Sequence, residues 1–288
     1  MPRTLMVYFS QGGTTRKIAE KISDGLNHRQ YQTDLHNLID GPPPDIKDYD
    51  MIGIGSPVYI YRPPFNMLDY IKSLPDFNGL PFFVFLLHGM HIGFAGNILR
   101  KTLEDKGGKE IGYTYFKGAD YFIGYVQRGV LFSPDNPTEE ELKSAEQFGR
   151  DIASHVSEKE YVKPDKDPFP PVVFAIEKMI TNRFFTKQAY SRFFKVDEKK
   201  CTACNICLEQ CPQGNIALDA NSFPKWGRDC NFCFYCEMKC PEDAISSPVD
   251  WLIFAPLINY NISFASKDPE IDQVRVRHAK GKTTRLEG

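Results

Sequence analysis

Two cysteine runs near the carboxyl end constrain this chain more than any other feature. The first reads CTACNICLEQCP from Cys201, and the second reads CNFCFYCEMKCP from Cys230. Each run has the spacing C-x-x-C-x-x-C-x-x-x-C-P, and together they contain every cysteine of the 288-residue chain. Shifting the first run onto the second superimposes all four cysteines and aligns Pro212 with Pro241. This internal repeat predicts two structural units related by pseudo-symmetry.

The spacing indicates iron–sulfur chemistry. Three cysteines two residues apart let a tight loop wrap one cubic cluster, with backbone N–H groups turned toward the sulfurs. Zinc is the alternative, because paired C-x-x-C is common in zinc ribbons, but those sites use two pairs rather than two triplets that each precede Cys-Pro. A disulfide framework is disfavoured, because all the thiols cluster in one segment and no secretory signal is recognisable.

Residues 194–249 resemble a bacterial-type ferredoxin, a small α+β domain with two 4Fe–4S clusters. In two-cluster ferredoxins the fourth cysteine of each run ligates the other cluster. The resemblance therefore implies two ligand sets, each drawn from both runs. They are Cys201, Cys204, Cys207 and Cys240 for the first cluster, and Cys230, Cys233, Cys236 and Cys211 for the second. An apolar shell that limits water is expected from Ile206, Phe223, Phe232, Phe234 and Ile245.

The first half of the chain alternates β-forming and helical patterns. Apolar, β-forming segments at 5–9, 32–38, 50–55, 82–87 and 111–116 are interleaved with helical patterns near 18–26, 65–74, 97–106 and 139–156. Thr138 and Glu141 have the spacing of a capping box at the start of the last helix, and residues 118–137 read as irregular. Such alternation predicts a doubly wound α/β domain with a parallel five-stranded sheet covered on both faces.

A glycine-rich turn follows the first of these strands. It reads Ser10-Gln11-Gly12-Gly13-Thr14-Thr15, and a helical pattern begins at once. The first N–H groups of a helix lack partners and attract anions, and glycines allow the backbone to approach a ligand closely. Because no Lys or Arg lies inside the loop, a monophosphate held by neutral donors is favoured over a triphosphate with its metal.

Residues 1–160 resemble flavodoxin, in which the sheet order is 2-1-3-4-5 and the ligand lies where strands 1 and 3 diverge. The resemblance implies FMN, with its phosphate on the glycine-rich turn and its ring between the loops after the third and fourth strands. The ring loops are expected to contribute Ser56, Pro57, Val58 and Tyr59, then His88, Gly89, Met90, His91 and Gly93. Tyr59 or Tyr61 could stack on the ring or simply pack, and the two histidines could bond the flavin or only fill the loop.

Beyond these domains the sequence predicts a linker and an extension. Residues 161–193 begin with a proline-rich stretch and continue into an amphipathic helix from Val172 to Phe184. That helix is expected to dock within its own chain rather than on a membrane surface, and a dimer contact stays open. Residues 250–288 form an extension in which 251–264 pack on the first domain. The basic end, from Arg275 to Arg285, is expected to be a solvated terminus or to steer an acidic redox partner.

Composition narrows the function classes. The formal net charge is −2 and the isoelectric point is near 6.3, which gives no signature for nucleic-acid binding. No apolar run approaches the length of a membrane span. The expected location is the reducing cytoplasm of an anaerobe.

As a whole the chain is similar to flavodoxin–ferredoxin fusion proteins. The resemblance implies electron transfer between two 4Fe–4S clusters and FMN, and on to a redox protein partner. The carrier hypothesis leads because neither a nicotinamide motif nor an obvious acid–base pair accompanies the flavin loops. An FMN-dependent reductase of a small acceptor (a quinone, nitro compound or oxygen) and a redox sensor are the alternatives. Whether the chain is an enzyme, and whether it forms a homodimer, stays open.

Overall fold

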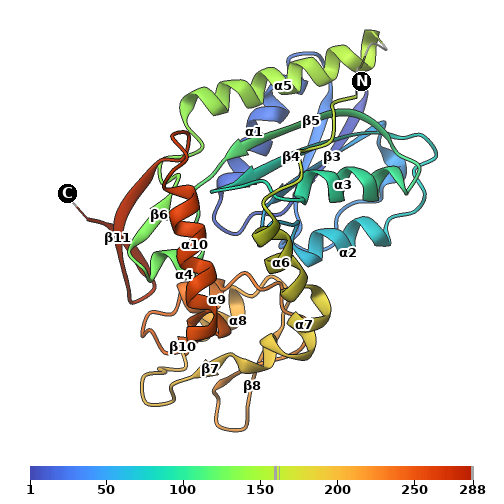
Figure 1. Ribbon diagram of the computed structural model, residues 1–288. Helices are drawn as coiled ribbons and strands as arrows, with labels where there is room; N and C mark the ends of the chain where they lie inside the picture. Colours follow the sequence, from blue (N-terminus) through green and yellow to red (C-terminus); the bar gives the residue numbers. More distant parts are fainter. Residues whose placement is uncertain (159–160, 162, 287–288) are drawn as a thin grey trace. The chain divides into compact units, whose positions relative to one another are not determined.

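The computed structural model describes residues 1–158, 161 and 163–286 (Figure 1). These residues form two compact units. The first, the sheet unit, comprises Met1–Ala119 and Asp135–Lys178. The second, the cysteine unit, comprises Asp120–Pro134 and the described part of Met179–Gly288. The division is therefore not a single cut of the chain, because residues 120–134 leave the first segment and join the second unit.

A five-stranded parallel sheet forms the centre of the sheet unit. Its strand order is β2-β1-β3-β4-β5, which confirms the predicted doubly wound topology. The strands are β1 (Arg3–Tyr8), β2 (Gln32–Asn37), β3 (Met51–Pro57), β4 (Pro81–His88) and β5 (Lys109–Lys117). The three central strands are almost wholly buried, as expected of a sheet with helices on both faces.

Helices cover both faces of this sheet (Figure 1). Alternate residues of β4 point to opposite sides, so that Val84 joins a core with α2 (Phe65–Ser73) and α3 (Ala95–Glu104), whereas Phe85 joins a core with α1 (Thr14–Asn27) and α5 (Glu139–Glu158). A single 3₁₀ turn, η1 (Ile46–Asp48), precedes β3. The predicted capping box is confirmed: Glu141 N–H donates to Thr138 Oγ1, and Thr138 N–H donates to the Glu141 carboxylate.

Very short elements connect the cysteine loops of the second unit. Two antiparallel strand pairs form, β7 (Lys195–Val196) with β10 (Ile245–Ser246), and β8 (Ile216–Leu218) with β9 (Pro224–Trp226). One short helix contains the third cysteine of each run: α8 (Ile206–Glu209) contains Cys207, and α9 (Tyr235–Met238) contains Cys236. The 3₁₀ turns η2 (Tyr190–Phe193), η3 (Pro248–Asp250) and η4 (Leu252–Phe254) flank this core.

The structure corrects two expectations about connecting segments and bears on a third. The stretch read as irregular contains α4 (Ile123–Val126) and β6 (Val130–Phe132). The basic end is not a loose terminus, because β11 (Gln273–Ala279) and β12 (Lys282–Arg285) form a hairpin that pairs with β6. Residues 251–264 are expected to pack on the first domain, residues 1–160, and α10 (Ala255–Ala265) does contact α4 of that range, which belongs to the cysteine unit. Long-range pairing of β6 with β11 orders the other two segments.

The predicted linker helix is two helices. α6 (Val172–Ile180) ends before α7 (Arg183–Gln188), and the Asn182 side chain caps α7 by accepting a hydrogen bond from Phe185 N–H at 3.1 Å. An asparagine at this position competes with helix continuation because its side chain replaces the missing backbone acceptor.

Among the residues that the structure describes, no helix is long and apolar enough to cross a membrane.

Candidate functional site

The glycine-rich turn lies at the carboxyl end of β1, where α1 begins. Gly13 is the N-terminal cap residue of α1, with φ of +90° and no side-chain cap. A side-chain carbon added at Gly12 or Gly13 would meet no atom within 4 Å, so the turn faces open space on that side. Uncapped N–H groups beside open space fit a phosphate group.

Ser10 anchors this turn. The Asn37 side chain accepts from Ser10 N–H at 3.1 Å and donates to Ser10 carbonyl oxygen at 3.0 Å, and all of these atoms are buried. Ser10 Oγ accepts from Arg16 N–H at 3.3 Å, which leaves the hydroxyl hydrogen for another acceptor. Thr14 is partly exposed, whereas Thr15 is buried. The sequence did not single out Asn37, whose role depends on the pairing of β1 with β2.

The loops after β1, β3 and β4 meet at this edge of the sheet. Tyr59 OH donates to Gln11 Oε1 at 2.9 Å, which joins the β3 loop to the glycine-rich turn. Phe94 N–H donates to Tyr61 carbonyl oxygen at 2.8 Å, which joins the β4 loop to the β3 loop. The structure thus brings together the three loops that the sequence assigned to FMN, at the point where ligands bind in such folds.

Tyr59 and Tyr61 have different surroundings. Tyr59 is partly exposed and meets Phe9 edge to face, with ring centroids 6.0 Å apart. Tyr61 is buried and lies face to face with Phe174, with centroids 4.1 Å apart and planes at 8°. Since one face of Tyr61 is already covered by Phe174, Tyr59 is the better candidate to stack on a flavin ring.

The remaining residues that are predicted to contact the flavin ring lie in the β3 and β4 loops. Ser56 is buried and its hydroxyl donates to Pro57 carbonyl oxygen at 2.9 Å, while Pro57 and Val58 are partly exposed. His91 Nδ1 accepts from Gly93 N–H at 2.8 Å, so a neutral His91 carries its hydrogen on Nε2. The others lie along the same loop: His88 and Gly89 are partly exposed, and Met90 is buried.

The cysteines of the second unit separate into two groups in space. A cleft is lined by Cys201, Cys204, Cys207 and Cys240, together with residues that include Pro224 and Ile245. All eight cysteines are free thiols, so no disulfide framework forms. The first predicted ligand set, including the cysteine from the other run, therefore faces one shared space.

Electrostatic interactions among the thiols show the same grouping. The pKa of the Cys207 thiol is raised to about 11, chiefly by burial and then by Cys204, Cys240 and Cys201. The pKa of Cys230 is raised chiefly by burial, and the thiols of Cys233 and Cys211 add to the effect. The pKa of Cys236 is raised by burial and then by Cys233 and Cys230. None of these interactions joins a thiol of one group to a thiol of the other, and each stays within one of the two predicted ligand sets.

Buried thiols whose thiolate forms repel one another ionise only when positive charge compensates them, and iron supplies such charge. Within the described residues, no three His, Cys, Asp or Glu side chains gather closely enough to hold a single metal ion. A cluster does not require such a gathering, because its four thiolates bind four different iron atoms. The cysteine thiols and their spacing fit an iron–sulfur cluster.

Backbone N–H groups point at three cysteine sulfurs, each at 3.3 Å. Asn215 N–H donates to Cys211 Sγ, and Ala244 N–H makes the equivalent bond to Cys240 Sγ in the other repeat. Phe232 N–H donates to Cys230 Sγ. Hydrogen bonds to ligand sulfurs stabilise the more negative, reduced state of a cluster and so adjust its potential.

The local backbone follows the sequence repeat. Asn205 and Phe234 occupy equivalent positions before α8 and α9, and both have left-handed φ, at 61° and 57°. Ala203 and Phe232 form a second equivalent pair, at 52° and 58°. A residue other than glycine costs free energy in the left-handed conformation. Four such residues at matched positions indicate that the cysteine loops impose this conformation.

Aromatic side chains surround the second cysteine group. Phe232 and Phe234 are buried with ring centroids 4.4 Å apart, and Phe194 stacks on Trp226 at 5.4 Å. Of the other predicted shell residues, Ile245 is buried, whereas Ile206 and Phe223 are partly exposed. The sequence missed Phe194 and Trp226 as members of this shell because their contact is not local.

A buried carboxyl group also escaped the sequence analysis. Glu237 is 4% exposed and accepts a hydrogen bond from Gln127 Nε2 at 3.0 Å. Burial, together with Asp250, raises the pKa of Glu237 to about 8. Gln127 belongs to the 120–134 segment, so this bond, with the Phe122–Phe234 ring contact at 5.5 Å, ties that segment to the cysteine loops.

Two segments of the chain match models of known protein families. Residues 5–120 match the model of the flavodoxin domain, and residues 193–241 match that of a 4Fe-4S dicluster domain. The chain is a flavodoxin–ferredoxin fusion. It is an electron-transfer flavoprotein. Its domains imply FMN and an iron–sulfur cluster as cofactors, and redox proteins as partners. The two matched segments lie on either side of the proline-rich linker in the sequence and include the loops and cysteines described above.

Individual relatives resemble one half at a time. An uncharacterized protein of Methanocaldococcus jannaschii is 27% identical over 147 residues, which cover 48% of this chain and 89% of that protein. Pyruvate synthase subunit PorD of the same organism is 38% identical over 52 residues, 18% of this chain and 60% of PorD. A solved flavodoxin from the domain Archaea superposes with a TM-score of 0.42 at 20% identity, covering 54% of this chain and 99% of its own.

Proposed function

We propose that this fusion protein carries electrons between two 4Fe–4S clusters and FMN, and passes them to a separate redox protein. The observation that carries the proposal is the sorting of eight thiols into two groups, each with three cysteines from one run and one from the other. Clusters supply one-electron transfer and FMN supplies one- or two-electron transfer, so their combination joins the two kinds of chemistry.

The chain's own residues hold and adjust these groups. The cluster ligands are Cys201, Cys204, Cys207 and Cys240 for one cluster, and Cys230, Cys233, Cys236 and Cys211 for the other. The N–H bonds to Cys211, Cys230 and Cys240 stabilise added negative charge, and the buried rings of Phe232 and Phe234 exclude water.

At the sheet unit, the turn from Ser10 to Thr15 binds the phosphate of FMN through backbone N–H groups and hydroxyls. The β3 and β4 loops would hold the isoalloxazine ring, with Tyr59 as the stacking residue. A neutral His91 holds its hydrogen on Nε2, because Nδ1 accepts from Gly93 N–H, and Nε2 is then a hydrogen-bond donor.

The test is anaerobic reconstitution of the full chain, followed by analysis of iron, sulfide and flavin. We expect about eight irons and eight sulfides with one FMN per chain. Dithionite reduction followed by stopped-flow reoxidation, read by EPR and visible absorbance, then shows whether clusters and flavin exchange electrons.

Bound zinc in place of iron, or flavin and clusters that never equilibrate, contradicts the proposal. Fast multiple turnover with a quinone or oxygen in the absence of a protein partner indicates a reductase instead.

A further inference from the structure

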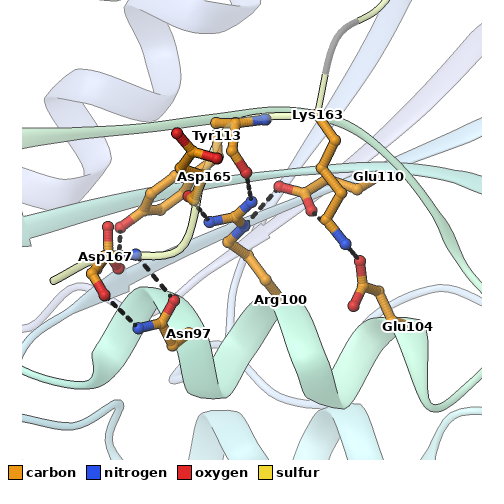
Figure 2. A network of polar contacts seen from close by, with 9 residues as sticks. Asn97, Arg100, Glu104, Glu110, Tyr113, Lys163, Asp165 and Asp167 are labelled. Atoms are coloured by element: carbon orange, nitrogen blue, oxygen red, sulfur yellow. Dashed lines mark hydrogen bonds and ion pairs between the residues drawn. The ribbon is translucent and has the colours of Figure 1, made fainter. Parts of the chain in front are cut away.

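A polar network fastens the segment that follows α5 to the sheet unit (Figure 2). We call residues 163–171 the strap. The Arg100 guanidinium, on α3, donates to the carbonyl oxygens of Pro164 at 2.6 Å and Asp165 at 2.8 Å. Arg100 Nε also donates to Glu110 Oε1 at 2.6 Å, and both side chains are buried. Carbonyls bound by a buried, charged donor are held firmly, so this end of the strap is fixed.

A second set of bonds fixes the strap two residues farther along. Asn97 Nδ2 donates to Asp167 carbonyl oxygen at 3.0 Å, and Asp167 N–H donates back to Asn97 Oδ1 at 3.0 Å. Tyr113 OH donates to the Asp167 carboxylate at 2.8 Å (Figure 2). A reciprocal pair of this kind fixes the direction of the strap as well as its position.

The strap leads directly into α6 and places Phe174 against the flavin loops. Phe174 is fully buried, stacks on Tyr61 of the β3 loop, and meets His91 of the β4 loop edge to face at 5.2 Å. Lys178, one turn along α6, lies 3.8 Å from the centroid of the Phe94 ring. Phe174, a single side chain from the linker, therefore contacts both loops that flank the proposed ring site.

These two loops depend on outside support. Ile60 and Tyr61 both have positive φ, at 46° and 61°, a conformation that side chains disfavour. Gly93 also has positive φ, and a Cβ there would lie 2.5 Å from Tyr61 Cβ, so the loops touch backbone to backbone. Strained loops keep their conformation only when surrounding contacts hold them, and the flat face of Phe174 is such a contact.

We propose that Phe174 is a positioning residue for the flavin: it fixes Tyr61 and His91, and with them both ring loops, in the conformation that binds the isoalloxazine. The inference rests on the proposed function, since it takes FMN as the ligand. The linker to the cysteine unit thereby takes part in the flavin site, and FMN affinity depends on how the strap is fastened.

The test uses the full chain and two variants that disturb the contact differently. Phe174→Leu keeps apolar volume but removes the flat ring. Asn97→Ala removes the reciprocal bonds to Asp167 and touches neither ring loop. Asn27→Ala, an exposed asparagine on α1, is the matched control. The readouts are the dissociation constant for FMN from fluorescence titration, the reduction potential of bound flavin, and hydrogen exchange of peptides over residues 57–64 and 88–94.

We expect Phe174→Leu to weaken FMN binding about tenfold, the loss of roughly one aromatic contact, and to shift the flavin potential. Asn97→Ala should move the affinity, the potential and loop exchange in the same direction by a smaller amount. Asn27→Ala should change nothing, and the cluster absorbance should be unaltered throughout.

If Phe174→Leu destabilises the sheet unit but leaves affinity and potential unchanged, Phe174 only packs, and the inference fails. It also fails if Asn97→Ala matches Asn27→Ala in every readout. A wild-type chain that does not bind FMN overturns the proposed function itself, and that result is read before any variant is compared.

Discussion

Replacing Arg100 with methionine should destabilise the sheet unit far more than an ordinary surface substitution. The Arg100 and Glu110 side chains are only 4% and 1% exposed, so the variant leaves a buried carboxylate without its main cation. Breaking a buried pair by removing one partner costs about 3–5 kcal/mol. Lys163 Nζ lies 3.5 Å from the other oxygen of Glu110 and offsets part of this loss, which favours the lower end, about 3 kcal/mol.

The loss should depend on pH in a definite direction. Burial already raises the pKa of Glu110 above its ordinary value of 4.5, and Arg100 opposes that shift. Without Arg100 the pKa rises further, so the folded state binds a proton that the unfolded state does not hold at the same pH. Stability is therefore regained as pH falls from neutrality toward 4.5. The double variant Arg100→Met with Glu110→Leu removes the unpaired carboxylate, so it should recover part of the stability at neutral pH, while the Pro164 and Asp165 carbonyls stay without the Arg100 donor.

Hydrogen-exchange mass spectrometry suits this measurement, because both tryptophans, Trp226 and Trp251, lie in the cysteine unit and do not report on the sheet unit. Peptides over α3 and β5 give the local free energy of opening. Lys101→Met is the control, since Lys101 pairs with Asp105 at the end of the same helix but is 74% exposed. Such a pair contributes less than about 0.5 kcal/mol. An Arg100→Met loss no larger than that of the control, or a double variant as damaged as the single, would refute the reasoning.

Three further predictions concern the other parts of the chain. Cys240→Ser should abolish the cluster held by Cys201, so that adding Cys201→Ser causes no further loss of iron or EPR signal. Gly13→Ala should weaken FMN binding and cost about 1 kcal/mol of sheet-unit stability, because φ is +90°, whereas Gly12→Ala, into open space, should cost little. Asp120→Asn should stabilise the cysteine unit by about 1–3 kcal/mol at pH 7, because burial raises the pKa of Asp120 to about 6 from 3.8. That gain should vanish as pH falls through 6 to 4 in tryptophan-monitored urea unfolding.

Local patterns in the sequence predicted the sheet unit well. The order of the sheet follows from alternating strands and helices, and the capping box at Thr138 from two side chains three residues apart. The positions of the three flavin loops follow from the carboxyl ends of parallel strands. Each of these features depends on residues close in sequence or on a topology rule, which is why they could be anticipated.

Segments ordered by distant partners could not be read in this way. β6 pairs with β11 from the far end of the chain, through the registers Val130 with Arg275 and Phe132 with Gln273. A signal for the hairpin was present: Val274 and Val276 alternate with polar residues before Lys280-Gly281, both of which have positive φ. Read by charge alone, the same residues look like a basic terminus.

The strap shows a second limit of sequence reasoning. Prolines mark residues 161–171 as a linker, and a linker is expected to be loosely held. Its order comes from Arg100 and Asn97, two polar residues on α3 whose partners are strap backbone atoms. Nothing in the spacing of a polar residue on a helix shows that it will bind a distant carbonyl.

The crossed arrangement of the cysteines has a consequence for how the second unit folds. In the proposed ligand sets neither run supplies all four thiols of a cluster, because Cys240 lies with the group around Cys207 and Cys211 lies with the group around Cys230. The strand pairs are two or three residues long and supply few hydrogen bonds of their own. Free energy of cluster binding is then free energy of folding, since a preformed site does not exist in the unfolded chain. The 120–134 segment and the terminal hairpin add apolar contacts, such as Phe122 with Phe234, that do not need metal. Removing the iron should therefore loosen the strand pairs while leaving the β6–β11 pairing in place.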